Sequence, residues 1–339
     1  MKIIKEKKKI QIPKRLRRLR WGVAGCGHFL ENTFLPTLQQ AKRSQLVSVY
    51  SSTAERANFI ASKFTAEEAY SDYDEFLKSD FDMLYVSSAN AHHYEQVIKA
   101  AKAGKNILCE KPLALTSEQA KEMIDVCEEN GVFLTVNYVY RFHPLIVKAR
   151  DLVENNLLGK ILSISTQFNI DFPPNDNFRF NKELSGGGAL RDLGTHMIDL
   201  LRFFGGEISE VTGFLDNAIY TSEVEDFATG LVKFEKGGYG GFQVSYSSKK
   251  SFNRIEITGY KGSISIENLI GKKNVPAKLI IDLDGESRKI FRKRANKLLY
   301  LIRSVQKAYF KNQPLQVTGY DGYINIKLME ELERQWKKD

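Results

Sequence analysis

The first side chain with clear chemical potential is Lys111, in the stretch Ile107–Pro112. This stretch has the pattern of a buried parallel strand that runs into a loop. Ligands of open α/β sheets gather just beyond the carboxyl ends of the strands, so a lysine placed there lies near whatever the sheet binds. Pro112 fixes its own φ and disfavours a helical conformation at Lys111, which makes the loop stiff. A surface turn is the alternative interpretation of Glu110-Lys111-Pro112 taken alone.

A second group of reactive side chains is the pair Asp192 and His196, which follows the glycines at positions 186–188. A spacing of four places both side chains on one face of a helix. An aspartate near a helix N-terminus is favoured by the helix dipole, and the glycines allow a substrate or cofactor to approach closely. An ordinary surface interaction is the alternative interpretation of this pair.

Together, these three side chains suit the oxidation of a secondary alcohol, which removes a hydride from carbon and a proton from oxygen. Histidine titrates near neutrality, so His196 suits the proton step, with a typical contribution of ~10²–10⁴-fold. Lys111 is placed to polarise the oxygen. The hydride chemistry would belong to a nicotinamide cofactor. No Cys or His spacing matches a metal site, so no metal is predicted.

The sequence near the N-terminus has the signature of a dinucleotide-binding fold. A short apolar strand over residues 21–24 is followed by Gly25-Cys26-Gly27-His28-Phe29-Leu30 and by a helix to about residue 40. Gly25 permits the tight turn, Gly27 lets backbone amides approach a pyrophosphate, and the helix N-terminus supplies positive potential. Leu30 stands where the signature has its third glycine, so the helix is expected to lie slightly further from the strand.

The choice between NAD and NADP depends on the end of the second strand, expected over residues 46–51. An NAD-selective site carries Asp or Glu there, which binds the ribose 2′-hydroxyl. In this chain Ser51 and Ser52 occupy the position, and Arg56 follows one helical turn later. Hydroxyls and a guanidinium suit a 2′-phosphate, so NADP is favoured modestly over NAD. A solvated Arg56 without a cofactor contact is the alternative.

The alternation of strands and helices predicts a doubly wound parallel sheet in the first part of the chain. After residue 141, closely spaced strands with short turns predict a mostly antiparallel sheet, interrupted by one long helix over residues 191–204. The predicted fold class is α/β, with a Rossmann-like domain over residues 21–141 and a C-terminal α+β domain over residues 142–339. Further strands are expected at 83–87, 106–109, 133–137, 161–168, 208–217, 227–234, 240–247, 253–258, 263–267 and 278–281, and further helices at 93–104, 117–130, 144–156, 296–310 and 320–337.

The first twenty residues differ in composition from the rest of the chain. They hold ten Lys or Arg and one Glu, whereas the residues after position 20 are balanced at 40 basic and 40 acidic. We expect residues 1–20 to be a solvated, mobile arm, with weak adhesion to anionic surfaces as its alternative role and no specific nucleic-acid binding. The basic stretch Arg288–Arg294 is expected to be a solvated loop. The three cysteines predict reduced, buried thiols in a cytoplasmic protein.

Four motifs occur in order along the chain: Gly25-Cys26-Gly27, Asn90-Ala91-His92-His93, Cys109-Glu110-Lys111-Pro112-Leu113-Ala114-Leu115-Thr116, and Gly187-Gly188 with Asp192 and His196. With Tyr138, Arg141 and Gly319-Tyr320-Asp321-Gly322, the sequence resembles the glucose–fructose oxidoreductase / inositol dehydrogenase / MocA (Gfo/Idh/MocA) family of nicotinamide-dependent oxidoreductases. The resemblance covers about residues 20–335.

The resemblance implies a role for each matching residue. Lys111 would contact the reacting hydroxyl and the nicotinamide ribose, His196 would be the general acid/base, and Asp192 would orient the imidazole or the substrate. The open sheet of the C-terminal domain would mediate contacts in a homo-oligomer, either a dimer or a tetramer. The expected cofactor-binding residues are Gly25, Gly27, His28, Phe29, Ser51, Ser52, Arg56, Asn90, Glu110, Lys111 and His93, the last of which alternatively only braces its loop.

The expected substrate is a sugar, a cyclitol or a nucleotide sugar. Tyr138, Arg141 and Arg179 are the candidates for substrate binding, together with Asp192 and His196. The polar loop Asn175–Asn177 near Arg179 is alternatively only turn chemistry. A catalytically silent dinucleotide-binding sensor or adaptor that uses the basic arm is the alternative function. A Rossmann methyltransferase would share the glycine turn but has no role for the lysine or the Asp–His pair.

Overall fold

Six parallel strands form the first sheet, in the order β3-β2-β1-β4-β5-β6. The computed structural model describes residues 17–270 and 275–336. The strand order reverses between β1 and β4, and a ligand crevice is expected there, at the carboxyl ends of the strands. The bounds are β1 Leu19–Ala24, β2 Ser44–Tyr50, β3 Glu68–Tyr70, β4 Met83–Val86, β5 Asn106–Cys109 and β6 Leu134–Val136.

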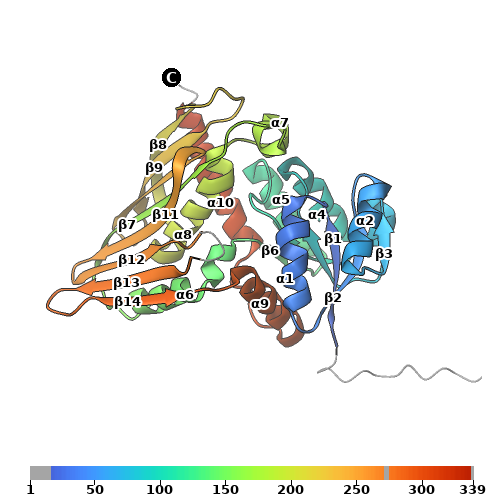
Figure 1. Ribbon diagram of the computed structural model, residues 1–339, viewed down its shortest axis with the longest axis horizontal. Coiled ribbons are helices and arrows are strands. Elements are labelled where there is room, and N and C mark those ends of the chain that lie inside the picture. The colour runs from blue at the N-terminus through green and yellow to red at the C-terminus, as the bar shows by residue number, and fades with distance from the viewer. Residues whose placement is uncertain (1–16, 271–274, 337–339) are drawn as a thin grey trace, which may run out of the picture.

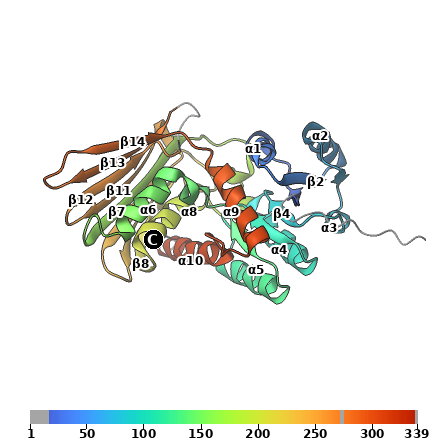
Figure 2. The ribbon, with the colours of Figure 1, turned by 90° about the horizontal axis from the view of Figure 1, so that it is seen from below.

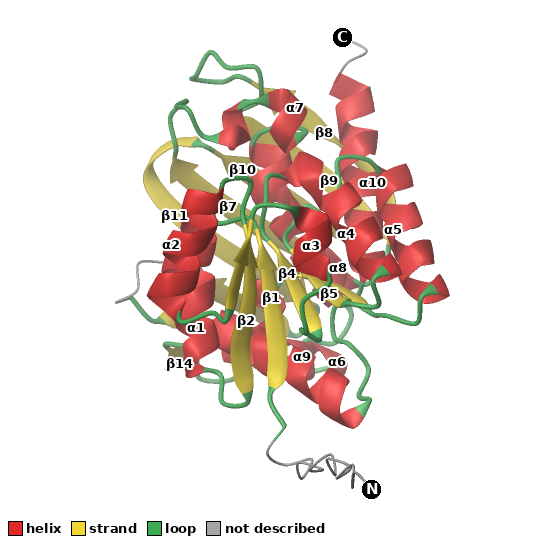
Figure 3. Ribbon diagram, turned by 90° about the vertical axis from the view of Figure 1, so that its right-hand side faces the viewer, coloured by secondary structure: helices red, strands yellow, loops and turns green. Residues whose placement is uncertain are grey.

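Helices cover both faces of this sheet (Figure 3). On one side lie α1 (Leu35–Gln40) and α2 (Ala54–Phe64), and on the other α3 (Tyr73–Leu77), α4 (His93–Lys102) and α5 (Ser117–Glu129). Because both faces are covered, the central strands are unbroken apolar runs, and all four residues of β4 are buried. The predicted doubly wound sheet is confirmed. Strand β3 and helix α3 were not predicted, because elements of three and five residues leave too little periodicity to read.

The residue at the third-glycine position, Leu30, is fully buried and begins a π-helical turn over Leu30–Phe34 that leads into α1. At the end of this turn, Phe34 stacks on Tyr85 with 3.6 Å between the ring centroids, and it meets Trp21 edge-on at 5.8 Å. The leucine therefore packs into the apolar core, and its side chain does not line the cavity beside the glycine turn.

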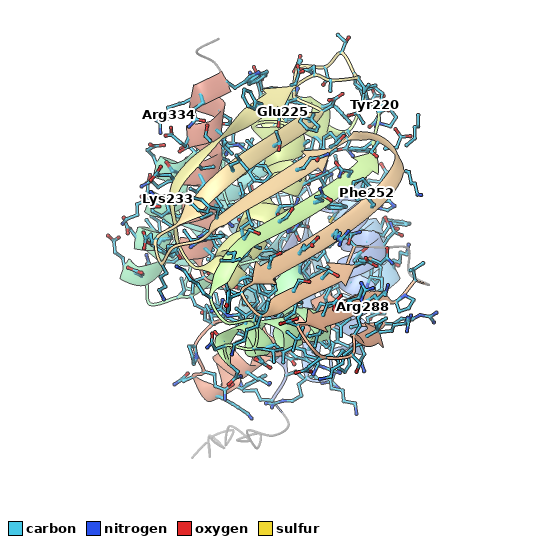
Figure 4. The ribbon with its side chains drawn as sticks, turned by 90° about the vertical axis from the view of Figure 1, so that its left-hand side faces the viewer. Tyr220, Glu225, Lys233, Phe252, Arg288 and Arg334 are labelled. Atoms are coloured by element: carbon cyan, nitrogen blue, oxygen red, sulfur yellow. The ribbon has the colours of Figure 1, made fainter. Side chains whose placement is uncertain are left out.

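Eight strands form the second sheet, in the order β14-β13-β12-β11-β7-β10-β9-β8. All neighbours are antiparallel except β7 and β10, so the predicted large, mostly antiparallel sheet is confirmed. One face packs on α6 (Pro144–Glu154) and α8 (Thr195–Gly205), and the other is open (Figure 4). The bounds are β7 Ile161–Asp171, β8 Ile208–Asp216, β9 Phe227–Phe234, β10 Tyr239–Ser245, β11 Ser247–Gly259, β12 Gly262–Glu267, β13 Ala277–Leu283 and β14 Lys289–Lys293.

The last two helices return from the second sheet to the first (Figure 2). Helix α9 (Lys297–Lys311) packs on α1, and the hydroxyl of Tyr309 donates to Asp82 at 2.7 Å. Helix α10 (Gly319–Trp336) packs on α5 and on β8, and Glu330 accepts a hydrogen bond from the backbone N–H of Ser117 at 2.8 Å. The two sheets are therefore joined by more than the chain crossing near residue 141.

The basic stretch near the edge of the second sheet differs from its prediction. The stretch Arg288–Arg294 is not a loop: Lys289–Lys293 forms β14, which pairs antiparallel with β13 at the sheet edge. Exposed lysines and arginines suit an edge strand because they oppose pairing with another chain, and the same composition is typical of a solvated loop.

The three cysteines are free and buried, as predicted. Most of the basic arm, residues 1–16, lies outside the described residues. Among the described helices, none has the length and apolar character needed to cross a membrane.

Candidate active site

The glycine turn after β1 is shaped for a dinucleotide. Gly25 has φ +91°, and a Cβ there would lie 2.3 Å from the backbone nitrogen of Ser88, so only glycine fits. A Cβ at Gly27 would have no atom within 4 Å, which leaves space for a ligand against its backbone. A cavity of about 450 Å³ lies beside the turn and extends to Ser51 and Ser52. The residues present therefore fit a bound dinucleotide, with His28 and Phe29 exposed at the start of the helix.

The guanidinium of Arg56 lies against the glycine turn. Its Nε donates to the carbonyl oxygen of Cys26 at 2.9 Å, and its Nη2 lies 2.5 Å from Glu31, which also binds Lys63 at 2.5 Å. Hydrogen bonds from Lys63 and Arg56 lower the pKa of Glu31 to about 2. The Arg56 side chain is thus held by contacts within the protein and is about one-third exposed, and its contact with a cofactor stays a prediction. Sequence reasoning missed Glu31, whose charge partly offsets the two cations. Ser51 is buried and Ser52 exposed.

The loop that follows β4 is fixed by two buried side chains. Asn90 donates from its amide to the carbonyl oxygen of Ser185 at 2.8 Å, which links this loop to the second domain. His93 lies between two backbone carbonyls: its Nδ1 is 3.0 Å from Pro112 and its Nε2 is 3.1 Å from Ser88. Burial lowers the pKa of His93 to about 4. In this structure His93 connects the cofactor side of the crevice to the Lys111 loop as a brace.

Glu110, the residue before the lysine, faces the interior of the sheet. Its carboxylate accepts hydrogen bonds from the hydroxyl of Tyr85 and the amide of Asn137. Both partners are buried. The structure therefore gives Glu110 a supporting position behind the crevice, although it was expected among the cofactor-binding residues.

Lys111 and Asp192 meet across the domain boundary. The Lys111 amine donates to both the carboxylate and the backbone carbonyl oxygen of Asp192, the latter at 2.8 Å. The second carboxylate oxygen, Oδ2, accepts from the Tyr246 hydroxyl at 2.9 Å and from Arg179 Nε at 3.1 Å. Although burial opposes ionisation, the Lys111 and Arg179 charges hold the pKa of Asp192 well below its usual range. The carboxylate is therefore ionised and fully engaged.

His196 lies one helical turn beyond Asp192 and is 7% exposed. Its ring packs edge-on against Tyr140, with 4.5 Å between centroids, and its Nδ1 is buried without a hydrogen-bond partner among the described residues. Burial, together with the Lys111 charge, lowers the pKa of His196 well below its usual value. The imidazole is therefore neutral and able to accept a proton. The hydrogen bonds of Asp192 go to Lys111, Arg179 and Tyr246, so Asp192 does not hold the imidazole directly.

The segment that carries these two residues is fixed by Glu225. Both oxygens of its buried carboxylate lie 3.0 Å from the backbone nitrogen of Gly188, and Oε1 also accepts from the N–H of Leu190 at 2.9 Å. These contacts anchor the π-helical turn Leu190–Gly194, which carries Asp192 and leads into α8. A Cβ at Gly188 would lie 2.0 Å from the Glu225 carbonyl oxygen, so this glycine is required for close packing. Such π turns are frequent at functional sites.

Two residues expected to bind substrate lie inside the core. Tyr138 is fully buried, and its hydroxyl contacts the Thr195 hydroxyl at 2.9 Å. Arg141 makes hydrogen bonds of 2.8 and 2.6 Å to Asp199, and its Nη2 is 2.9 Å from Asp321. These contacts correct the expectation that Tyr138 and Arg141 face the pocket, because their polar atoms are already used to join α8 and α10 to the Rossmann-like domain.

Arg179 reaches the site as expected, but its neighbouring loop does not. Asn177 accepts a hydrogen bond from the N–H of Arg179 at 3.1 Å, and Asn175 accepts from that of Asn177 at 3.0 Å. These are local turn contacts, as the alternative interpretation proposed. The site residues missed from the sequence are Tyr140, next to His196, and Tyr246, next to Asp192. In the sequence each is a tyrosine next to a turn, and this pattern is too common to identify a site residue.

Within the described residues, no three His, Cys, Asp or Glu side chains gather as metal ligands. The absence of a metal from the reaction stays a prediction.

Comparisons with known proteins agree with this geometry. Residues 19–138 match a family model described as an oxidoreductase family with an NAD-binding Rossmann fold, and residues 146–265 match the GFO/IDH/MocA C-terminal domain. A 1,5-anhydro-D-fructose reductase from Ensifer adhaerens is 30% identical over 79% of this chain and 82% of its own length. A levoglucosan dehydrogenase from Pseudarthrobacter phenanthrenivorans is 30% identical over 60% of each chain.

Solved structures show the same fold. An aldose-aldose oxidoreductase from Caulobacter crescentus, complexed with glycerol, superposes with a TM-score of 0.86 at 24% identity, over 95% of this chain and 98% of its own. A levoglucosan dehydrogenase in complex with NADH and levoglucosan also gives a TM-score of 0.86, at 23% identity and with the same coverage.

Proposed function

Because the chain belongs to the GFO/IDH/MocA family of NAD(P)-dependent oxidoreductases, we propose that it transfers a hydride between the nicotinamide and a secondary alcohol or ketone of a sugar, a cyclitol or a nucleotide sugar. The observation that supports this best is the meeting of Lys111, Asp192, Arg179 and Tyr246 across the domain boundary. The named activities of the relatives, which include the reductase and dehydrogenase above, support a sugar-like substrate.

Each polar group in the site would have a separate task. A bound nicotinamide would supply or accept the hydride, and Gly25 and Gly27 would allow its pyrophosphate to approach the backbone. Neutral His196 accepts the hydroxyl proton during oxidation and returns it during reduction. The Lys111 amine hydrogen-bonds the reacting oxygen, whose developing negative charge it stabilises. Asp192 fixes that amine in place, since Tyr246 and Arg179 hold its other carboxylate oxygen.

The proposed cofactor preference is NADP, by a modest margin. Support comes from the end of β2, where Ser51 and Ser52 replace the carboxylate of an NAD-selective site. Arg56 lies next to this position, but its pairing with Glu31 reduces the charge that it offers to a 2′-phosphate. Both cofactors occur among similar proteins. A related D-xylose 1-dehydrogenase is named for NADP, and a levoglucosan dehydrogenase of the same fold was solved in complex with NADH.

The first experiment is a side-by-side titration of the purified protein with NADH and NADPH, followed by a panel of sugars and nucleotide sugars. Turnover is then compared between wild type, Lys111→Ala and a control, Lys121→Ala, whose lysine pairs with Asp125 on the exposed face of α5. We expect Lys111→Ala to retain cofactor binding and to lose turnover, and the control to retain both. Cofactor binding without turnover in the wild type would support the sensor or adaptor instead, and absence of cofactor binding would refute the proposed function.

We also propose that the open face of the second sheet joins copies of the chain. Large apolar side chains on it are strongly exposed, among them Phe214 at 72% and Leu231 at 67%. Exposed apolar area of this kind commonly marks an interface. Light scattering of the purified protein should show a dimer or tetramer, and Leu231→Glu should shift it toward the monomer. A monomeric wild type would refute this assignment.

A further inference from the structure

A second cavity, of about 670 Å³, lies between the start of α1 and the edge of the second sheet. Asn32, Thr33 and Thr37 contribute hydrogen-bonding groups from the Rossmann-like side, and Leu269 and Ala277 line the sheet side. Residues 293–298, from the end of β14 into α9, line a third side of the cavity. Helix α9 packs on α1 (Figure 1). This volume lies within the range of ~300–1,000 Å³ that is typical of small-molecule binding sites.

This cavity adjoins the place where the reaction is proposed to occur. Tyr140 lines it, and the same ring packs against His196 at 4.5 Å. Lys297 lies on the cavity side, with its amine 5.0 Å from the centre of the Tyr140 ring. Phe29, two residues beyond Gly27, also lines the cavity. A substrate held at His196 and Lys111 would thus reach into the cavity with any group that extends past Tyr140.

The charged side chains among the described residues of the cavity lining are all positive. They are Lys293, Arg294 and Lys297, and none of these lining residues is Asp or Glu. In the part of the chain that the structure describes, none of the three makes an ion pair, whereas at the outer end of β14 Arg288 pairs with Asp282 and Lys289 with Glu286.

Lys297 is the deepest of these three cations. Its amine donates to the Leu269 carbonyl oxygen at 3.2 Å, and burial lowers its pKa to about 8. A partly desolvated amine without a counter-ion is costly, and an anion beside it would remove that cost. The surrounding Asn and Thr side chains add neutral donors of the kind that bind carboxylate or phosphate oxygens.

We propose that this cavity binds an acidic substituent, a carboxylate or a phosphate, carried by the substrate whose alcohol or ketone reacts at Lys111 and His196. The proposal rests on the proposed function and narrows its substrate class to sugar acids, sugar phosphates and nucleoside diphosphate sugars. Lys297 binds the anion nearest the reacting carbon, and Lys293 and Arg294 bind charge nearer the cavity mouth.

The test is calorimetric titration of the full chain, saturated with whichever of NADH or NADPH it binds. The ligands are glucose as the neutral reference, glucuronate for the carboxylate, glucose 6-phosphate for the phosphate monoester, and UDP-glucose for the diphosphate. The variants are Lys297→Gln and the double variant Lys293→Gln/Arg294→Gln, whose exposed positions leave the core untouched. Lys289→Gln is the matched control, since it removes a cation of the same strand that pairs with Glu286 outside the cavity.

We expect at least one anionic ligand to bind tenfold or more tightly than glucose, with the advantage lost in both cavity variants and retained in the control. The ligand that binds identifies the carboxylate or the phosphate as the source of the charge. If all four ligands bind with equal affinity, or if an anionic ligand still binds more tightly than glucose in both cavity variants, the proposal is wrong. The proposed function would remain supported in that case, provided that the protein binds its cofactor and shows turnover. If neither cofactor binds, the proposed function fails, and the same titrations without cofactor decide the cavity on the same criteria.

Discussion

Acidification should weaken the fold through His93, the imidazole between the Ser88 and Pro112 carbonyls. Its pKa is lowered to about 4 by burial, against a value near ~6.5 in an unfolded chain. The folded state therefore binds this proton more weakly than the unfolded state. The stability from neutral His93 is complete above about pH 6.5 and is lost as the pH falls toward 4. Each unit in that window costs about 1.36 kcal/mol, so about 2 kcal/mol is lost by pH 5.0.

A pair of variants isolates this contribution. His93→Gln removes the titrating group and keeps one polar contact, and His92→Gln is the control because that neighbour is exposed. Urea unfolding at pH 7.5 and pH 5.0 should show a smaller stability loss in His93→Gln than in the wild type, by about 2 kcal/mol. His92→Gln should lose as much as the wild type. His143, whose pKa burial also lowers to about 4, contributes equally in all three proteins.

Nuclear magnetic resonance gives an independent measure, since the chain has five histidines and each imidazole can be followed. The signal assigned to His93 by its absence in His93→Gln should remain that of a neutral ring from pH 8 to pH 5. If His93 titrates near 6.5, or if His93→Gln loses as much stability as the wild type at pH 5.0, burial does not lower the pKa of His93.

Three further substitutions follow from contacts in the site. Gly188→Ala should prevent folding, because the new Cβ would lie 2.0 Å from the Glu225 carbonyl oxygen, and soluble yield with circular dichroism checks it. Tyr246→Phe removes a hydrogen bond to ionised Asp192 and should lower kcat about tenfold or more at unchanged cofactor affinity; an unchanged kcat would remove Tyr246 from the site. Arg141→Met leaves a buried carboxylate without its partner and should cost about 3–5 kcal/mol in urea unfolding, whereas a substrate-binding residue would affect KM alone.

The fold was predictable from sequence because periodicity and turn residues are local signals. The runs at Met83–Val86 and Asn106–Cys109 and the glycines at 25 and 27 lie within short windows, and each predicted its element. What escaped prediction was short or charged. Strand β14 has five exposed residues, and its cations, which protect an edge, have the same composition as a solvated loop.

The candidate site was predictable only where a motif carried the residue. Lys111 and Asp192 stand 81 positions apart, and their separate motifs were enough to place both in one site. Asp199 and Asp321 converge on Arg141 from two distant helices, and no local spacing indicates such a contact. Tyr246 was missed for the same reason, because a contact that depends on strand register across a sheet leaves no trace in local spacing.

The return of α9 and α10 to the first sheet has a consequence for exchanging parts between relatives. Gly322 packs against Leu113 and Val136, and the Thr135 hydroxyl donates to the Val317 carbonyl oxygen at 2.7 Å. Residues 297–336 thus complete the apolar surface of the Rossmann-like domain, although they follow the second sheet in sequence. In a chimera with a single junction near residue 141, α9 and α10 would come from one relative and the Rossmann-like domain that they cover from the other. A grafted substrate sheet needs two junctions, with its host's own terminal helices kept in place.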